Sequence, residues 1–339
     1  MKLAALGYYG FSNLGDEAVL AGIRSALATE SRFDGAEFLV LSNAPEETKR
    51  LHPGVTATDR WSWKGAWDAL SGTDLFLFGG GSLLQDATSV KSVLWYFLMA
   101  SLARKRAKKL LWWGQGIGPL NSPHSRRLTS ILARRADIIS VRDERSAELL
   151  KEIGVSGSID LVADPAFALE PAEHSQTTGT LLSLRAWPGS TGNWTVPAKA
   201  PQPLLYLPMH LPEDKEILKP GVEVLDSKES GATIAETMGR FAASELVIAM
   251  RLHALIFAAR CGVPFVPISY DPKVDALAKA AGQQDVLLPT ALVTDETMNE
   301  MVEKVMESAA ARRVRLQAFA AERRSAALLP ARRAAELFA

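Results

Sequence analysis

The sequence predicts an α/β protein made of two Rossmann-like domains, and three observations support this fold class. Short apolar stretches alternate with longer helical patterns, which is typical of a parallel sheet covered by helices on both faces. The alternation stops at a polar, unpatterned stretch at 170–179 and then resumes. Glycine-rich or charged residues follow several of the apolar stretches directly. The sequence therefore indicates two doubly wound units that face each other across a cleft.

The first half of the chain reads as a complete Rossmann-like domain. Its expected strands are 3–7, 37–41, 75–78, 109–113 and 137–141, and its expected helices are 16–27, 63–70, 89–104, 123–133 and 144–153. We assign this N-terminal domain to residues 1–170. The polar stretch that follows, 171–179, reads as a linker.

The second half repeats the pattern. Its expected strands are 180–184, 204–207, 222–225, 245–249 and 265–267, and its expected helices are 234–242, 252–260 and 274–281. We assign this C-terminal domain to residues 180–310. The proline-rich stretch 186–203 reads as a mobile loop.

The end of the chain, 311–339, is rich in alanine and arginine and is expected to form a helix that crosses between the domains. Residues 312–339 hold seven arginines and two glutamates. A solvated amphipathic face explains this local charge better than RNA binding does, because a nucleic-acid binder would normally carry a basic excess overall. The chain of 339 residues has 38 basic and 38 acidic side chains, so its formal net charge is zero.

Composition places the protein among folded chains of a reducing compartment. Hydrophobic residues make up 47% and charged residues 22%, which argues against disorder. One cysteine allows neither an intrachain disulfide nor a cysteine-based zinc cage. The first residues, MKLAALGYYG, read as a strand rather than a signal peptide. We therefore expect a cytoplasmic protein.

The longest apolar run, 93–102, is followed by a basic cluster at 104–109. The run is about half the length that a bilayer requires. A buried helix whose C-terminal dipole is matched by cations explains it most simply. The alternative is a peripheral, basic and apolar patch on the inner face of an anionic membrane.

Two glycine-rich segments follow strands of the first half. After the first strand comes GYYGFSNLGDE, in which Asn13 and Asp16 are candidates for binding a polar ligand, although Asp16 also suits the start of a helix. After the strand at 75–78 comes GGGS, in which Gly80 and Gly81 would let a ligand lie against backbone N–H groups. A further glycine-rich loop is expected at 114–119, after the strand at 109–113.

Charged residues follow three other strands. Arg142 comes directly after the strand at 137–141 and suits a carboxylate or phosphate, the alternative being an ion pair with Asp143 or Asp164. Arg251 and His253 follow the strand at 245–249. The positive end of a helix dipole lowers the pKa of a histidine at a helix start, which favours the neutral form that can act as a base.

Lys273 opens a further helix after the last strand of the second half, where a cation opposes the helix dipole. Together with Arg142, Arg251 and His253, it would form a cationic set suited to a small ligand that carries a carboxylate and a phosphate. The sequence contains no HExxH motif, no Asp-x-Asp pair and no Gly-x-Ser-x-Gly elbow, so we expect neither a metal nor a serine nucleophile. His210 also follows a strand but receives no role.

The strand-end motifs together resemble the bacterial polysaccharide pyruvyl transferase family. They extend from residue 7 to about residue 273 and are, in order, GYYGFSNLGDEAVL, FLFGGGSLLQD, WWGQGIGP, ISVRDERS, ADPAF and AMRLHALIFAA. The sequence is most similar to the branch that pyruvylates a cell-wall polymer precursor used to anchor surface-layer proteins.

The resemblance implies a glycosyltransferase-B-like fold and transfer of pyruvyl from phosphoenolpyruvate to a sugar as a ketal, with release of phosphate. It implies that Arg142, Arg251, His253 and Lys273 bind phosphoenolpyruvate. We expect His253 and Arg251 to be catalytic, because the unperturbed pKa of histidine is nearest to the working pH and an arginine can stabilise the departing phosphate. Asn13, Asp16, Gly80 and Gly81 would face the sugar acceptor, which is lipid-linked in the resembling branch. Phosphoenolpyruvate is a co-substrate, so no cofactor is expected.

Three alternatives remain open at the level of sequence. The chain could be a nucleotide-sugar glycosyltransferase of the same architecture, a non-catalytic polysaccharide-binding module, or a nucleic-acid binder that uses its basic tail. The sequence does not indicate the oligomeric state.

Overall fold

A computed structural model describes the chain except residues 88, 173–177, 187–196, 212, 215–221 and 226–230. Its internal contacts divide the chain into two compact units. The first unit consists of Met1–Phe11, Asp16–Leu169 and Arg323–Ala339, and the second of Ser12–Gly15 and Glu170–Glu322. Most of the expected loop at 186–203 and of the expected linker at 171–179 lies outside the described residues.

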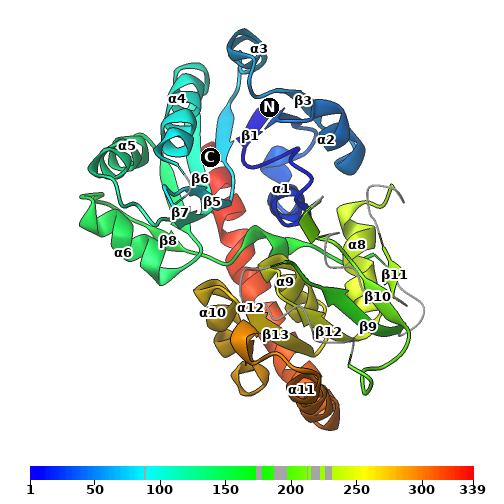
Figure 1. Ribbon diagram of the computed structural model, residues 1–339. Helices are drawn as coiled ribbons and strands as arrows, with labels where there is room; N and C mark the ends of the chain where they lie inside the picture. Colours follow the sequence, from blue (N-terminus) through cyan, green and yellow to red (C-terminus); the bar gives the residue numbers. More distant parts are fainter. Residues whose placement is uncertain (88, 173–177, 187–196, 212, 215–221, 226–230) are drawn as a thin grey trace. The chain divides into compact units, whose positions relative to one another are not determined.

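The first unit is built on a parallel sheet of eight described strands (Figure 1). The strand order is β3-β2-β1-β4-β6-β7-β8, and β5 pairs with the far end of β6. The strands are β1 Lys2–Leu6, β2 Glu37–Ser42, β3 Thr56–Asp59, β4 Leu75–Phe78, β5 Gly81–Leu84, β6 Lys109–Ile117, β7 Ile138–Val141 and β8 Asp160–Leu161. Every residue of β4 and β7 is buried, as expected for strands covered on both faces.

Helices of the first unit connect these strands, and four of them begin at polar caps. They are α1 Leu14–Leu27, α2 Pro45–Leu51, α3 Trp63–Ala69, α4 Val90–Arg106, α5 Pro123–Ala133 and α6 Glu144–Glu152, with short 3-10 turns at Ser31–Phe33 and Pro165–Ala168. The side chains of Ser62, Ser89, Ser122 and Asp143 each accept a hydrogen bond from a first-turn amide. Such caps satisfy N–H groups that a helix leaves unpaired.

The second unit has its own parallel sheet, with the strand order β11-β10-β9-β12-β13-β14. Its strands are β9 Thr178–Ser183, β10 Leu204–Tyr206, β11 Glu223–Val224, β12 Ser244–Ala249, β13 Phe265–Ser269 and β14 Leu288–Pro289. Its helices are α8 Ile234–Ala242, α9 Leu252–Arg260, α10 Pro272–Ala280 and α11 Asp295–Glu307, with 3-10 turns at Gln284–Val286 and Thr290–Leu292. The final helix, α12 Ala309–Glu336, is divided between the two units at residue 322.

The prediction of two Rossmann-like domains is confirmed, and most predicted elements agree with the structure to within a few residues. The structure adds elements that the sequence pattern did not predict, namely α2, β3, β5 and β14. β3 has the sequence TATD and only partial burial, so it lacks the apolar signal of a central strand. The C-terminal segment is helical, as its composition predicted.

One predicted loop is wrong. Residues 114–117 continue β6 instead of leaving the sheet, because β5 pairs with this stretch on one side and β7 on the other. Gly114 has a φ of +55°, and the register against β7 shifts between Trp112 and Gln115, so the glycine forms a bulge within the strand. The buried Gln115 amide then donates to the Phe78 carbonyl at 2.9 Å.

Arg312 anchors the first turns of α12 within the second unit. Its side chain is 2% exposed and donates to Gln283 Oε1 at 2.9 Å, to Ser308 Oγ at 2.8 Å and to both carboxylate oxygens of Asp285 at 3.0 and 2.6 Å. Part of the arginine excess at the C-terminus therefore serves the fold. The hydrogen bonds from Arg312 hold the pKa of Asp285 below its usual range.

This ion pair predicts a pH-dependent stability. A lowered pKa in the folded state stabilises the fold at pH values above the unfolded pKa of about 3.9, and that contribution is lost as the pH falls through the folded pKa. Asp285→Asn should therefore lower the free energy of unfolding at pH 7 by about 1 kcal/mol and by less near pH 3. Urea unfolding at both pH values tests this, with Asp275→Asn on an exposed face as the control. Equal costs at the two pH values would contradict the assignment.

Candidate functional site

The turn after β1 is held by a buried carboxylate. The amide of Gly10 donates to Glu17 Oε1 at 2.7 Å, and Glu17 Oε2 lies 2.9 Å from His52 Nε2. Glu17 and His52 are 1% and 2% exposed. Glu17 therefore fixes the turn that leads into α1, a structural task.

Asp16 and Gly81 meet at the carboxyl edge of the first sheet. Gly81 has a φ of +98°, and a Cβ added there would lie 3.1 Å from Asp16 Oδ1. The strands β1 and β4, which precede these residues, are neighbours in the sheet. The buried glycine thus leaves no side chain between its backbone and this carboxylate. A Cβ at Gly80 would lie 3.0 Å from Val19 Cγ1, so close packing alone favours glycine at that position.

Arg142 lies at the same edge, after β7, and is held from two sides. Its Nη1 donates to Asp164 Oδ2 at 2.7 Å, and its Nη2 donates to Ser82 Oγ at 3.0 Å. The sequence offered an ion pair with Asp164 as the alternative to anion binding by this arginine, and the structure contains that ion pair. The guanidinium is 10% exposed, and a Cβ at Gly116 would lie 3.1 Å from its Nε. The guanidinium group of Arg142 is therefore fixed in orientation, as recognition of a planar anion requires.

The second unit places Arg251 against a buried carboxylate. Arg251 is the N-cap residue of α9, and its Nε donates to Asp214 Oδ1 at 3.0 Å, while its Nη2 also donates to that carboxylate. Asp214 is fully buried and accepts the amide hydrogens of Met209 and His210, both at 2.9 Å. Burial opposes the charge of Arg251, but the hydrogen bonds that it donates to Asp214 outweigh this effect and raise the pKa of the guanidinium.

Glu213 contacts a histidine and two arginines at this edge. Its Oε2 lies 3.3 Å from His210 Nδ1, 3.3 Å from Arg251 Nη2 and 3.9 Å from Arg185 Nη2. Partial burial would raise the pKa of Glu213, but His210 and the two arginines overcome this and lower it. The cluster therefore holds an ionised carboxylate at neutral pH.

His253 lies in the first turn of α9 and packs against Gly15. A Cβ added to Gly15 would lie 2.2 Å from His253 Nδ1, so only glycine fits beneath the ring. Asn13 Oδ1 accepts the amide hydrogen of Gly15 at 3.0 Å. Asn13 also forms an isolated bridge with His210, and the Leu14 amide donates to the Met209 carbonyl at 2.8 Å. The segment Ser12–Gly15 thus contacts both His210 and His253.

Lys273 is exposed at the start of α10, one strand away from Arg251. Its amide donates to the cap residue Asp271 at 2.8 Å. The aspartate supplies the negative charge that suits the helix start, so the lysine side chain is not needed for the helix. Nearby in sequence, the Tyr270 ring has the guanidinium of Arg185 5.2 Å from its centre.

The structure thus groups the predicted residues by unit. Asp16, Gly80, Gly81 and Arg142 lie at the carboxyl edge of the first sheet, and Asn13, Arg251, His253 and Lys273 belong to the second unit. The sequence prediction did not select Arg185, which follows β9 and Leu184 as Arg142 follows β7. The position directly after a strand could have identified it. Ser82, Asp214 and Gly15 gain their roles through contacts with residues distant in the sequence, and no local signal marks Asp214.

The described residues offer neither a cluster of metal ligands nor a reactive thiol. Among the described residues, no group of three or more His, Cys, Asp or Glu side chains could hold a metal ion. Burial raises the pKa of the Cys261 thiol to about 12, so this side chain is protonated at neutral pH and is a poor nucleophile.

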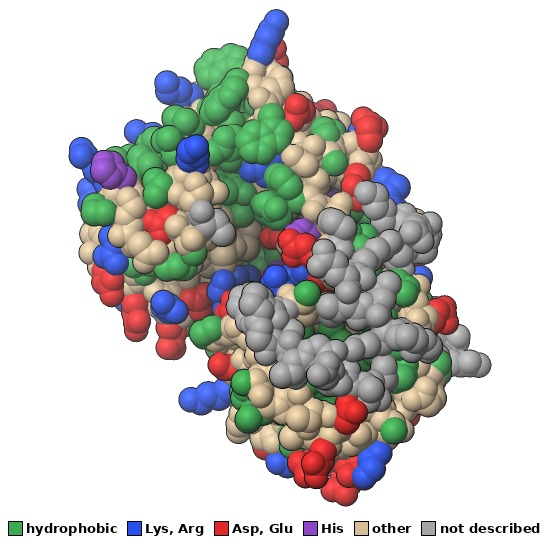
Figure 2. All heavy atoms as spheres, viewed as in Figure 1, with side chains coloured by type: hydrophobic (Ala, Val, Ile, Leu, Met, Phe, Trp, Pro, Cys, Tyr) green, Lys and Arg blue, Asp and Glu red, His purple; other side chains and the backbone are tan. Residues whose placement is uncertain are grey.

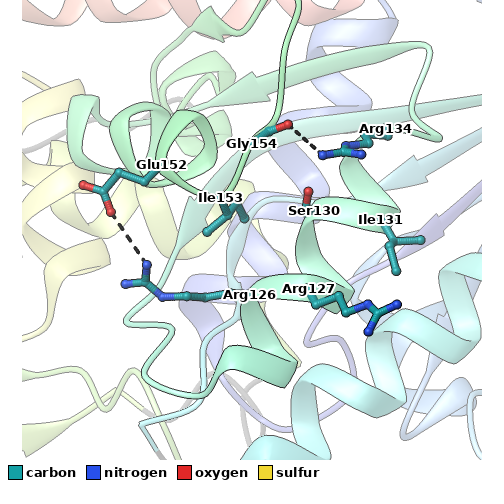
Figure 3. A pocket seen from close by; sticks show the side chains of 8 residues that line it. All are labelled: Arg126, Arg127, Ser130, Ile131, Arg134, Glu152, Ile153 and Gly154. Carbon is teal, nitrogen blue, oxygen red and sulfur yellow. Dashed lines mark hydrogen bonds and ion pairs between the residues drawn. The ribbon is translucent and has the colours of Figure 1, made fainter.

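A cavity of about 660 Å³ lies elsewhere on the first unit, between α5 and α6 (Figure 3). Arg126, Arg127 and Arg134 line it, but Arg126 pairs with Glu152 at 4.0 Å and Arg134 donates to the Gly154 carbonyl at 3.0 Å. It contains none of the predicted site residues. Arg126 and Arg134 thus connect α5 to α6 and to the turn that follows α6.

The Arg251–Asp214 contact predicts a large stability effect. Asp214→Ala removes a buried partner of Arg251 and leaves the amides of Met209 and His210 without their acceptor, so the free energy of unfolding should fall by about 3–5 kcal/mol. Urea unfolding measures this. Glu213 is 53% exposed, so Glu213→Gln should cost less than about 1 kcal/mol. Similar costs for the two variants would refute the assigned difference.

Comparison with known proteins decides the family. The model of the polysaccharide pyruvyl transferase family matches residues 13–272. The chain belongs to this family. The matched range includes every predicted site residue except Lys273, which lies one residue beyond it. None of the curated proteins matches the sequence.

Solved structures show which fold this family member has. The UDP-GlcNAc 2-epimerase of Neisseria meningitidis, bound to UDP-GlcNAc, has a TM-score of 0.59 at 12% identity, with 99% of each chain covered. HepE from Anabaena, in complex with UDP-glucose, has a TM-score of 0.58 at 13% identity, with 100% of this chain and 99% of that chain covered. These likenesses support a glycosyltransferase-B-like fold of two Rossmann-like domains and nothing more specific.

Proposed function

We propose that this pyruvyl transferase family member transfers pyruvyl from phosphoenolpyruvate to a sugar of a cell-wall polysaccharide precursor, as a ketal. The observation that supports the donor is the set of fixed cations at two sheet edges. Arg142 is held by Asp164 and Ser82, and Arg251 by Asp214. Guanidinium groups fixed in this way suit the carboxylate and phosphate of a small donor.

The proposed reaction begins at the methylene carbon of phosphoenolpyruvate and ends with a cyclic ketal on the sugar. An acid protonates the methylene carbon of the donor, which becomes the methyl group and leaves cationic character at the central carbon. One sugar hydroxyl adds to that carbon while a base takes its proton. Phosphate then leaves with the electrons of its C–O bond. A second hydroxyl of the same sugar adds to the resulting cationic carbon and gives its proton to a base, which closes the ketal.

His253 is the proposed acid/base group, because its unperturbed pKa is nearest to neutral among the side chains. Gly15 and the first turn of α9 hold its ring in place. Arg142, Arg251 and Lys273 would bind the donor and stabilise the departing phosphate, an effect worth about 10²–10³ in rate per contact. Asn13, Asp16, Gly80 and Gly81 would face the acceptor.

The deciding experiment is an incubation of the full chain with phosphoenolpyruvate and a lipid-linked disaccharide. We expect release of inorganic phosphate together with an acceptor mass increased by one pyruvyl ketal. A parallel incubation with UDP-glucose tests glycosyl transfer, which would increase the acceptor mass by a hexose instead. Sugar binding without any phosphate release would indicate a non-catalytic module and overturn the proposal.

A double-mutant cycle tests whether Arg142 and Arg251 act on one donor. Each arginine is replaced by Gln, and the affinity for phosphoenolpyruvate is measured by calorimetry for the single and double variants. Coupling between the two changes supports one shared donor. Additive losses would assign the two arginines to different ligands.

A further inference from the structure

The outer surface of α3 and α4 is unusually apolar. Side chains of six residues here are large, hydrophobic and at least 40% exposed: Trp61, Trp63, Trp67, Val90, Leu94 and Leu98. Figure 2 shows hydrophobic side chains gathered over the part of the first unit where Figure 1 places α3 and α4. We name these six residues the apolar face.

The apolar face is continuous across the two helices. The rings of Trp61 and Trp95 lie 5.1 Å apart, which connects the turn after β3 to α4. The guanidinium of Arg106, at the end of α4, lies 4.4 Å from the centre of the Trp67 ring on α3. These contacts join Trp61 and Trp67 to α4, the helix that also carries Leu94 and Leu98.

The fold itself does not require this apolar face. α4 already buries Val93, Tyr96, Met99, Ala100 and Ala103 in the core of the first unit, which confirms that it is a buried helix on that side. Val90, Leu94 and Leu98 recur every four residues on its opposite side and are 42–43% exposed. An ordinary surface helix would carry polar side chains at these positions.

Cations accompany the apolar face. The sequence of α4, VKSVLWYFLMASLARKR, contains four basic residues and no carboxylate. In the described part of the chain, Lys64, Lys91 and Lys105 are exposed and form no ion pair within 4.0 Å. Asp59 and Asp68 are the nearby exposed acids of this region in sequence. The surface therefore combines tryptophan, leucine and unpaired lysine with a positive local charge.

We propose that the apolar face is a peripheral docking surface for an anionic phospholipid bilayer. Tryptophan rings favour the membrane–water interface, leucines gain from burial among acyl chains, and lysines gain from anionic headgroups. The surface does not cross the membrane, since no described helix is long and apolar enough to do so. The membrane is thus a partner of this unit independently of the proposed pyruvyl transfer.

The position of the face suits a lipid-borne substrate. β3 and β4 are parallel members of one sheet, and Trp61 and Gly79 each follow the end of their strand closely. Trp61 and the glycine loop therefore both lie at the carboxyl edge of the sheet. A bilayer bound to the apolar face would bring a lipid-linked sugar to the edge that holds Asp16 and Gly81.

Vesicle binding by the full chain tests this surface without donor or acceptor. Co-sedimentation is measured with phosphatidylcholine vesicles, with and without phosphatidylglycerol. We expect binding to the anionic vesicles that weakens as salt rises, because salt screens the charges. Trp63→Ser with Leu94→Ser should lower the partition coefficient at least about tenfold. Lys64→Gln with Lys91→Gln should lower it about fivefold per charge removed.

Matched controls use exposed residues of other surfaces. Leu292→Ser with Val314→Ser removes apolar side chains that are 58% and 67% exposed, and Lys151→Gln with Lys279→Gln removes two exposed cations. Both control variants should bind vesicles like the original chain. Absence of binding, or equal losses in controls and face variants, would overturn the proposal. So would a dimer in sedimentation velocity that Trp63→Ser with Leu94→Ser dissociates, because a second copy would then cover the face.

Discussion

Replacement of His253 by alanine is expected to lower turnover with phosphoenolpyruvate by about 10²–10⁴, the range typical of a lost general acid or base. The affinity for phosphoenolpyruvate should change much less, because the fixed arginines supply most of the charge that holds the donor. Initial rates of phosphate release give the first quantity, and calorimetry with the donor alone gives the second.

The matched control is His124→Ala, which removes an exposed histidine from α5 of the first unit. This variant should keep the turnover of the original chain. If His253→Ala bound the donor normally and turned over at a near-normal rate, the acid/base assignment would be wrong. If it lost donor affinity and turnover in equal measure, His253 would be a binding residue only.

A methyl group added at Gly15 should have the next largest effect, although Gly15 carries no functional group. The methyl would lie 2.2 Å from His253 Nδ1, so the ring must move to accept it. A displacement of about 1 Å at a reacting group can cost about 10²-fold in rate. Gly15→Ala should therefore lower turnover about 10²-fold while donor affinity changes little, and the free energy of unfolding should fall by about 1–3 kcal/mol. Phosphate release and urea unfolding measure these effects.

Gly239→Ala provides the comparison, since Gly239 is also a helical glycine of the second unit. A methyl there would approach the Ala172 carbonyl to 3.2 Å, a contact that a small shift relieves. Its turnover should stay within about twofold of the original, because an ordinary Gly→Ala change in a helix affects stability rather than chemistry. Loss of turnover in both variants through unfolding would remove the case for Gly15 as a positioning residue.

The sequence predicted elements best where the pattern was strongly apolar. β4, α5, α8 and α9 have the predicted bounds, because burial on both faces of a strand, or on one face of a helix, leaves a local periodicity. β3 was missed because an edge strand with partial burial has no such signature. Residues 114–117 were read as a loop because glycines usually interrupt strands, whereas here two neighbouring strands hold them in the sheet.

The sequence was sufficient to predict where β7 and β12 end, and with these ends the positions of Arg142, Arg251 and His253. These positions follow from local hydrophobic periodicity and from the chemistry of the residue after each strand. Only the tertiary structure decided how these side chains are held. Asp214 accepts hydrogen bonds from Arg251, 37 residues later in the chain, and Asp164 accepts one from Arg142, 22 residues earlier. Gly15 lies against His253 although the two belong to opposite halves of the sequence. Such pairs depend on strand order and on the course of the chain between sheets, which no local pattern specifies.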